Sequence, residues 1–185
     1  GELVAIYAIS DLHLSFGVNK PMNIFGEVWN DYEEEIKKNW LENVKEEDTV
    51  IISGDISWAM SLEESINDFE YINSLPGKKI LVRGNHDYYF STKSKMNKFF
   101  ESQGMKDFYI LHNNAYVVED YIICGSRGWG KTDGNTAEKC PSGTPANSYN
   151  ECNKALSEDR NLWAMDLVYD IMQNIAKDKD TTQSV

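Results

Sequence analysis

The sequence predicts an α/β fold with a largely parallel sheet. Two observations support this: short apolar segments alternate with amphipathic segments, and their spacing is that of βαβ units. Residues 3–9 form a near-continuous apolar run, which is typical of a strand buried on both faces. Further strands are expected at 49–53 and 79–82. Right-handed crossovers would place the three side by side.

The helices are predicted from apolar residues that recur at steps of three and four. The first is expected over 29–44, and its buried face consists of Trp29, Tyr32, Ile36, Trp40 and Val44. A second helix is expected after a capping box in which Ser61 faces Glu64. A third begins at Ser91 and ends at Gly104.

The rest of the chain is predicted in less detail. Short strands are expected at the ranges 108–111, 116–118 and 121–124. Residues 131–155 are rich in Gly, Asn, Ser and Thr without periodicity and predict a long loop, and residues 156–177 predict a helix. Residues 178–185 are expected to be a frayed tail. At about 150 residues per domain, residues 1–185 are expected to form a single domain.

Composition and charge narrow the classes of partner. The net charge is −12 without a basic stripe, which disfavours nucleic acid as a bulk electrostatic partner. No apolar run approaches the roughly 20 residues of a membrane span, so no membrane partner is expected. The three cysteines form no CxxC pair, so a cytoplasmic location is expected.

Polar side chains follow three of the predicted strands at the point where each ends. Asp11 and His13 follow the first, Asp55 follows the second, and Asn85 and His86 follow the third. Because the carboxyl ends of parallel strands line the ligand crevice of an open sheet, these side chains are expected to converge.

These residue types suit a centre with two metal ions. Two divalent cations roughly 3.5–4 Å apart can clamp a phosphate and share a hydroxide. Asp55 is the candidate bridging ligand, Asp11 and His13 would complete the first ion's ligands, and Asn85 would serve the second. The donors suit Mn, Fe or Zn. His86 could then protonate the leaving oxygen.

The motifs Asp-x-His, Gly-Asp and Gly-Asn-His-Asp lie at Asp11–His13, Gly54–Asp55 and Gly84–Asp87. Over about residues 3–130 the chain resembles the calcineurin-like metallophosphoesterases, in particular a small bacterial branch of predicted phosphohydrolases. The resemblance implies a β-sandwich flanked by helices that hydrolyses small phosphoester substrates through a metal-bridging hydroxide. It also implies Asp11, His13 and Asp55 as ligands of one ion, Asp55 and Asn85 as ligands of the other, and His86 as general acid.

The chain departs from that family in its histidines. The family supplies further histidines from its C-terminal half, whereas this sequence has none after His112, for which a turn position is expected. The C-terminal half is therefore expected to be incomplete or diverged. A missing half would leave a sheet face or edge uncovered and favour a homo-oligomer. The alternative function is a catalytically impaired relative that binds one metal or a partner.

A second phosphate motif is present. Residues 125–132 match the P-loop pattern GxxxxGK[ST], with Lys131 and Thr132 in the positions that would meet phosphate and Mg²⁺. A P-loop requires a helix from Lys131 onward, and the residues that follow, with Pro141, disfavour one. A P-loop NTPase is therefore the lesser alternative. Within this motif Arg127 is a candidate for substrate binding, since its planar fork suits phosphate oxygens.

Overall fold

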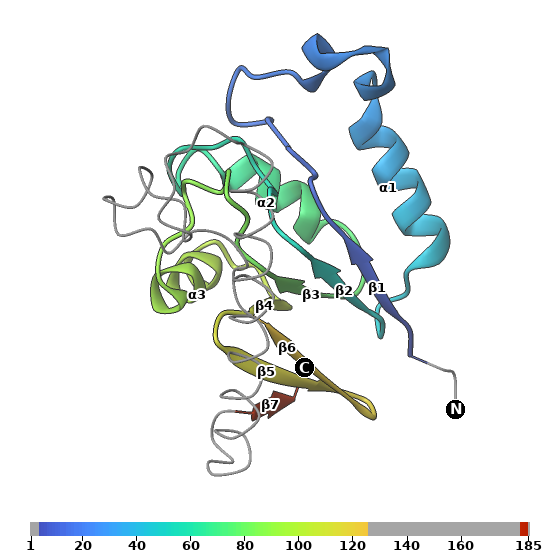
Figure 1. The fold of residues 1–185 in the computed structure, drawn as a ribbon, viewed down its shortest axis with the longest axis vertical. Coiled ribbons are helices and arrows are strands. Elements are labelled where there is room, and N and C mark those ends of the chain that lie inside the picture. The colour runs from blue at the N-terminus through green and yellow to red at the C-terminus, as the bar shows by residue number, and fades with distance from the viewer. Residues whose placement is uncertain (1–3, 126–181, 185) are drawn as a thin grey trace, which may run out of the picture. The chain divides into compact units, whose positions relative to one another are not determined.

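The computed structural model describes residues 4–125 and 182–184. A four-stranded parallel sheet has the order β1-β2-β3-β4, as Figure 1 shows, with its strands at Ile6–Ile9, Thr49–Ile52, Lys78–Leu81 and Phe108–Ile110. The predicted parallel sheet is confirmed. The last residues of the four strands are paired in register, Ile9 with Ile52, Ile52 with Leu81 and Leu81 with Ile110. All four strands therefore end at one edge of the sheet.

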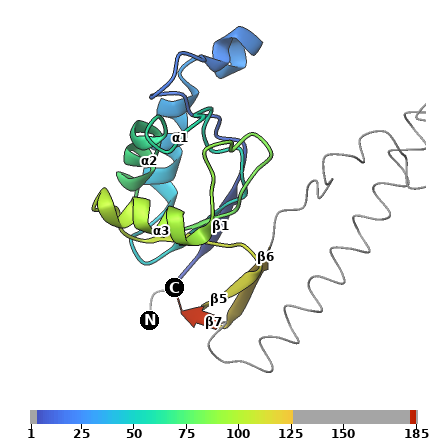
Figure 2. The same cartoon turned by 90° about the vertical axis from the view of Figure 1, so that its left-hand side faces the viewer.

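Three helices lie together on one face of this sheet (Figure 2): α1 (Tyr32–Asn43), α2 (Ile66–Asn73) and α3 (Lys93–Ser102). The first helix begins three residues later than predicted. Residues 22–25 and 27–29 form the 3-10 helices η1 (Met22–Phe25) and η2 (Glu27–Trp29), and Asp31 has a left-handed φ of 53° that separates them from α1.

The other two helix starts also differ from the predictions. The predicted contact between Ser61 and Glu64 is present, with the Glu64 N–H 3.3 Å from Ser61 Oγ, but it precedes α2 by a turn. The cap of α3 is Thr92 instead of Ser91, because Thr92 Oγ1 accepts the N–H of Lys95.

A second sheet has the order β6-β5-β7, with strands at Asn114–Val118 (β5), Tyr121–Gly125 (β6) and Thr182–Ser184 (β7). Strands β5 and β6 form an antiparallel hairpin. The prediction of a frayed tail was wrong at β7, because hydrogen bonding to a strand distant in sequence is not visible in a local pattern. The predicted loop at 131–155, the helix at 156–177 and Arg127 lie outside the described residues, and the single-domain assignment stays a prediction.

Alternate residues of the parallel sheet belong to two hydrophobic clusters. Val50, Ile52 and Leu81 pack in the cluster that includes the helices. Their neighbours Ile51 and Ile80 pack in a second cluster with residues of β5 and β6. Side chains of a strand point alternately to its two faces, so helices and a second sheet can each cover one face.

Strand β1 is less buried than its apolar run predicts. None of its four residues is fully buried, and Ala8 is exposed. The expectation of burial on both faces was wrong here because β1 is the terminal strand of its sheet. Within the described residues, no helix combines the length and the apolar character needed to cross a membrane.

Candidate metal centre

The loops after β1 and β2 continue the pairing of their strands. The N–H of His13 donates to the carbonyl of Asp55 at 2.9 Å, and the N–H of Leu14 donates to the carbonyl of Ile56 at 2.9 Å. The N–H of Trp58 in turn donates to the carbonyl of Leu14 at 2.9 Å. This backbone pairing places His13 beside Asp55, although 41 residues of sequence lie between them.

Two glycines allow the loop after β3 to approach the loop after β2. A Cβ on Gly84 would lie 2.1 Å from both the backbone nitrogen and Oδ1 of Asp55. A Cβ on Gly54 would lie 2.6 Å from the Cα of Gly84, and Gly54 has a φ of +98°. Glycine is therefore required at both positions for the loops to meet.

Asp87 holds the two loops together, a role that the sequence motif does not reveal. Its carboxylate is fully buried and accepts the backbone N–H groups of Gly84 at 2.7 Å, Asp55 at 2.9 Å and Ile56 at 2.8 Å. The hydroxyl of Tyr89 donates to it at 3.0 Å. Burial raises the pKa of Asp87, and the backbone hydrogen bonds oppose that rise.

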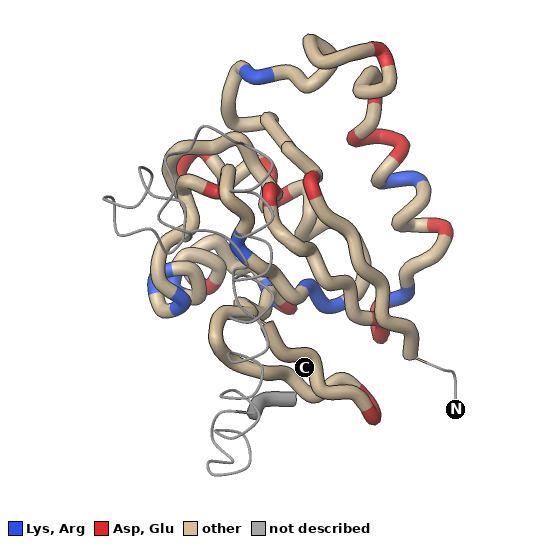
Figure 3. Tube along the Cα trace, viewed as in Figure 1, with Lys and Arg blue, Asp and Glu red and all other residues tan. Residues whose placement is uncertain are grey.

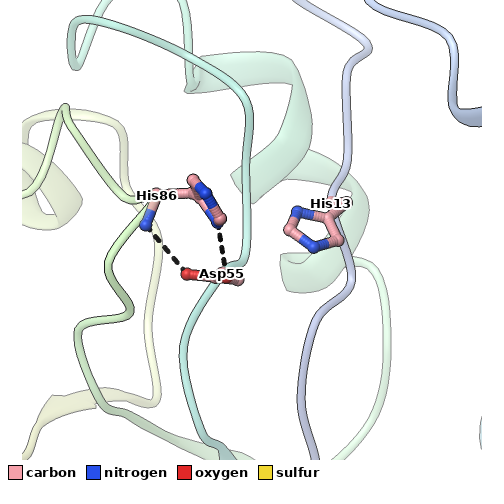
Figure 4. A group of neighbouring side chains, drawn as sticks. All are labelled: His13, Asp55 and His86. Carbon is pink, nitrogen blue, oxygen red and sulfur yellow. Dashed lines mark hydrogen bonds and ion pairs between the residues drawn. The ribbon is translucent and has the colours of Figure 1, made fainter. Parts of the chain in front are cut away.

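His13, Asp55 and His86 form the central cluster (Figure 4). Each offers one potential ligand atom, and these atoms lie within 4.8 Å of one another. The backbone N–H of His86 donates to Asp55 Oδ1 at 2.9 Å, and its Nδ1 lies 2.8 Å from Asp55 Oδ2. The Nδ1 of His13 is buried without a hydrogen-bond partner. A buried nitrogen of this kind and the set of imidazole and carboxylate donors both fit a divalent transition metal.

The charge states of two cluster residues also suit a metal. Burial lowers the pKa of His13 below its usual 6.5, against the opposing attraction of Asp55 and Asp11. Burial would raise the pKa of Asp55, but its hydrogen bonds with His86 outweigh this and hold it below 3.8. At neutral pH this gives a neutral imidazole and an ionised carboxylate, the forms that bind metal ions.

Asp11 and Asn85 lie at the margin of the cluster instead of within it. Asp11 is exposed, with Oδ1 3.8 Å from His13 Nε2. Asn85 is also exposed, and its amide nitrogen lies 3.3 Å from both ring nitrogens of His86. The structure thus brings three of the five predicted centre residues into one group and leaves these two beside it.

The backbone at the centre has an unusual conformation. Asp11, His13 and Asp55 have positive φ angles of 57°, 46° and 51°. For residues other than glycine the left-handed region costs on the order of 1–3 kcal/mol, and such strain concentrates at functional sites. The hydrogen bonds between the loops hold these conformations, and no sequence pattern indicated them.

Aromatic side chains surround His13. The ring of Trp58 stacks on it with centroids 4.6 Å apart, and Trp29 meets it edge-on at 6.5 Å. The hydroxyl of Tyr32 donates to the His13 carbonyl at 2.8 Å. The prediction that Trp29 packs in the core as part of a helix was wrong, because Trp29 lies on η2. His112 is exposed between β4 and β5, as expected for a turn residue.

Two cavities lie near these elements. One of about 440 Å³ adjoins the centre and is lined in part by Met22, Trp29 and Tyr32. Another, of about 630 Å³, lies between α1 and β1, and none of the three cluster residues lines it. None of the three cluster residues lines the first cavity either, but Trp29 and Tyr32, which both contact His13, are part of its lining.

Fold and cluster together define an α/β protein with a site that could hold a metal ion. The chain belongs to the calcineurin-like phosphoesterase family, whose model matches residues 4–178. The match extends beyond residue 130, where the resemblance seen in the motifs ends.

Other comparisons add little. A protein of unknown function from Aquifex aeolicus has a solved structure that is 21% identical, with a TM-score of 0.42, covering 83% of this chain and 71% of that one. A likeness at this level carries no conclusion about function. No match was found among curated proteins.

Proposed function

We propose that the protein is a metal-dependent phosphoesterase that uses two divalent ions (Mn, Fe or Zn) to hydrolyse small phosphoester substrates. The observation that carries the proposal is the group of three nitrogen and oxygen ligand atoms within 4.8 Å at His13, Asp55 and His86. Family membership supports the reaction class. A cytoplasmic location is part of the proposal and rests on cysteine use.

Asp11, His13 and Asp55 would hold one ion, and Asp55 and Asn85 the other. When bound, the ions would supply Lewis-acid stabilisation of the phosphoryl group and a bound water of lowered pKa. Asp55 suits the bridging position because a carboxylate offers two oxygens, and both of these lie at the centre, one against the backbone N–H and the other against the ring of His86. The exposed positions of Asp11 and Asn85 leave their oxygens accessible for the remaining ligand bonds.

His86 would act as the general acid. Its Nδ1 lies 2.8 Å from the Asp55 carboxylate, so a proton on Nδ1 has an acceptor that fixes the orientation of the ring. Nε2 is then the atom that would deliver a proton to the leaving oxygen. The cavity of about 440 Å³ lined in part by Trp29 and Tyr32, two residues that contact His13, would receive the alcohol part of the substrate.

The alternative function, a catalytically impaired metal-binding relative, is favoured by one observation. Only three residues offer carboxylate or imidazole atoms that all lie within 4.8 Å of one another in the described part of the chain, and Asp11 is not one of them. The P-loop alternative at 125–132 rests on residues that, apart from Gly125 at the end of β6, lie outside the described part of the chain.

Hydrolysis of an aryl phosphodiester in the presence of Mn²⁺ tests the proposal. Asp55→Asn and His86→Ala should each abolish metal-stimulated turnover, while His112→Ala and Asp120→Asn, at exposed positions, should leave it unchanged. Calorimetric titration should give two Mn²⁺ ions per chain. Binding of one ion without turnover would support the impaired relative, and a wild type without metal-stimulated turnover would refute the enzyme.

A further inference from the structure

The segment between β1 and α1 supplies a lysine close to the metal centre. The Lys20 ammonium lies 3.1 Å from the ring centroid of Trp58, a cation–π contact. The segment is anchored by two further contacts. The Phe16 N–H donates to Asp68 on α2 at 2.7 Å, and Trp58 Nε1–H donates to the sulfur of Met22 at 3.1 Å. The two further contacts hold the segment on either side of Lys20 against other elements.

Trp58 connects this lysine to the centre. Its ring lies 4.6 Å from that of His13 and 5.2 Å from that of His86, measured between centroids. Combined with the 3.1 Å contact, these distances place the Lys20 ammonium at most about 8 Å from the ring centroids of His13 and His86. A metal ion lies about 2 Å from a ligand nitrogen, and an ammonium contacts a phosphate oxygen at about 2.8 Å, so a phosphoryl group bound at the centre would lie within reach of the flexible Lys20 side chain.

The charge around the centre gives this lysine a role. The chain has a net charge of −12, and Asp and Glu are prominent on α1 and on the loops that follow the parallel strands (Figure 3). These carboxylates oppose the approach of an anionic substrate, and the ions of the proposed centre and the Lys20 ammonium would together offset them. Within residues 4–125 the Lys20 ammonium forms no ion pair with a carboxylate. Its positive charge is thus available to an anion at the centre.

We propose that Lys20, held on the indole ring of Trp58, binds a non-bridging phosphoryl oxygen of the substrate and favours the dianionic phosphomonoester over the monoanionic diester. The inference rests on the proposed function and assigns the substrate class of the same site. The preference follows because a cation at this position gains more from the second negative charge of a monoester.

The test compares Lys20→Met with Lys20→Arg and with Lys38→Met, an exposed lysine on α1. Methionine keeps an unbranched stem on Trp58 and removes the charge. With Mn²⁺, Lys20→Met should lower kcat/KM for p-nitrophenyl phosphate by about 10- to 100-fold, the effect of losing a charged hydrogen bond. The loss should appear mainly in KM, be smaller for bis(p-nitrophenyl) phosphate and be largely rescued by arginine. Lys38→Met should match the wild type.

Phosphate binding separates this inference from the proposed function. Titration of the Mn²⁺-loaded protein with inorganic phosphate should show weaker binding by Lys20→Met than by the wild type, with Mn²⁺ affinity unchanged. If the wild type hydrolyses neither ester, the proposed function fails, and the phosphate titration still decides the role of Lys20. Equal phosphate affinity in wild type and Lys20→Met, no phosphate binding by either, or equal losses for monoester and diester would overturn the inference.

Discussion

Replacing Asp87 with alanine should both destabilise the protein and weaken metal binding at the candidate centre. The Asp87 carboxylate is the acceptor for backbone N–H groups of both the loop after β2 and the loop after β3. Alanine would leave these three buried donors without the acceptor that they have in the structure. The loops that carry Asp55 and His86 would then lose their common anchor.

The size of the effect follows from these contacts. An unsatisfied buried donor costs about 1–3 kcal/mol, so three donors cost about 3–9 kcal/mol. Burial raises the pKa of Asp87, which means that removing its charge relieves a desolvation cost and moves the net loss to the lower part of that range. We expect about 4 kcal/mol, a large share of the 5–15 kcal/mol that stabilises a typical domain.

Urea unfolding at pH 7 measures this loss, and Tyr89→Phe is the matched control. That variant removes only the 3.0 Å hydroxyl contact with Asp87 and should cost about 1 kcal/mol. Mn²⁺ affinity, measured below the unfolding transition, should fall in Asp87→Ala and be nearly unchanged in Tyr89→Phe. A loss below about 1 kcal/mol in Asp87→Ala, with metal binding intact, would refute the role of Asp87 as the anchor of the two loops.

Further predictions concern the glycine contact and two buried titratable groups. Gly84→Ala should abolish Mn²⁺ binding because the added Cβ would clash with Asp55. Gly104→Ala is the control: it has a positive φ but open space around it, so it should cost about 1 kcal/mol of stability and retain Mn²⁺ binding. Equal Mn²⁺ affinities in the two variants would contradict this prediction. Burial lowers the pKa of Lys79, so the unfolded chain binds more protons than the folded one. The free energy of unfolding of the wild type, relative to that of Lys79→Met, should therefore rise as the pH increases toward 10.5. If urea unfolding shows a difference between the two proteins that does not change with pH, the predicted effect of burial is wrong. The pKa of His13 is also lowered, so the metal-free protein should gain stability relative to His13→Gln as pH rises toward 6.5, and a gain on acidification would show the opposite sign.

Much of the architecture could be predicted from local patterns. Short apolar runs separated by amphipathic segments are typical of a parallel sheet with crossover helices. The order of the motifs also predicted that Asp11, His13, Asp55, Asn85 and His86 follow strands whose ends meet. The structure agrees with this expectation, because Ile9, Ile52, Leu81 and Ile110 are paired in register at the ends of their strands.

The helix starts and the composition of the central cluster could not be predicted in this way. The start of α1 depends on the left-handed backbone of Asp31, and the position of Trp29 beside His13 follows from it. Membership of the cluster depends on backbone pairing between loops and on the buried Asp87, which connect residues about 30 to 40 positions apart.

The sequence by itself determined the class of fold, the family and the loops that hold the candidate ligands, because periodicity and motif spacing are local properties of the chain. Only the tertiary structure decided that His13, Asp55 and His86 form the central group, that Asp11 and Asn85 stand at its margin, and that Lys20 is close to it. The reason is that these positions are set by contacts between segments distant in sequence. Close glycine contacts, a buried carboxylate and stacked rings determine the distances between the side chains of different loops, and a local sequence pattern does not contain that information.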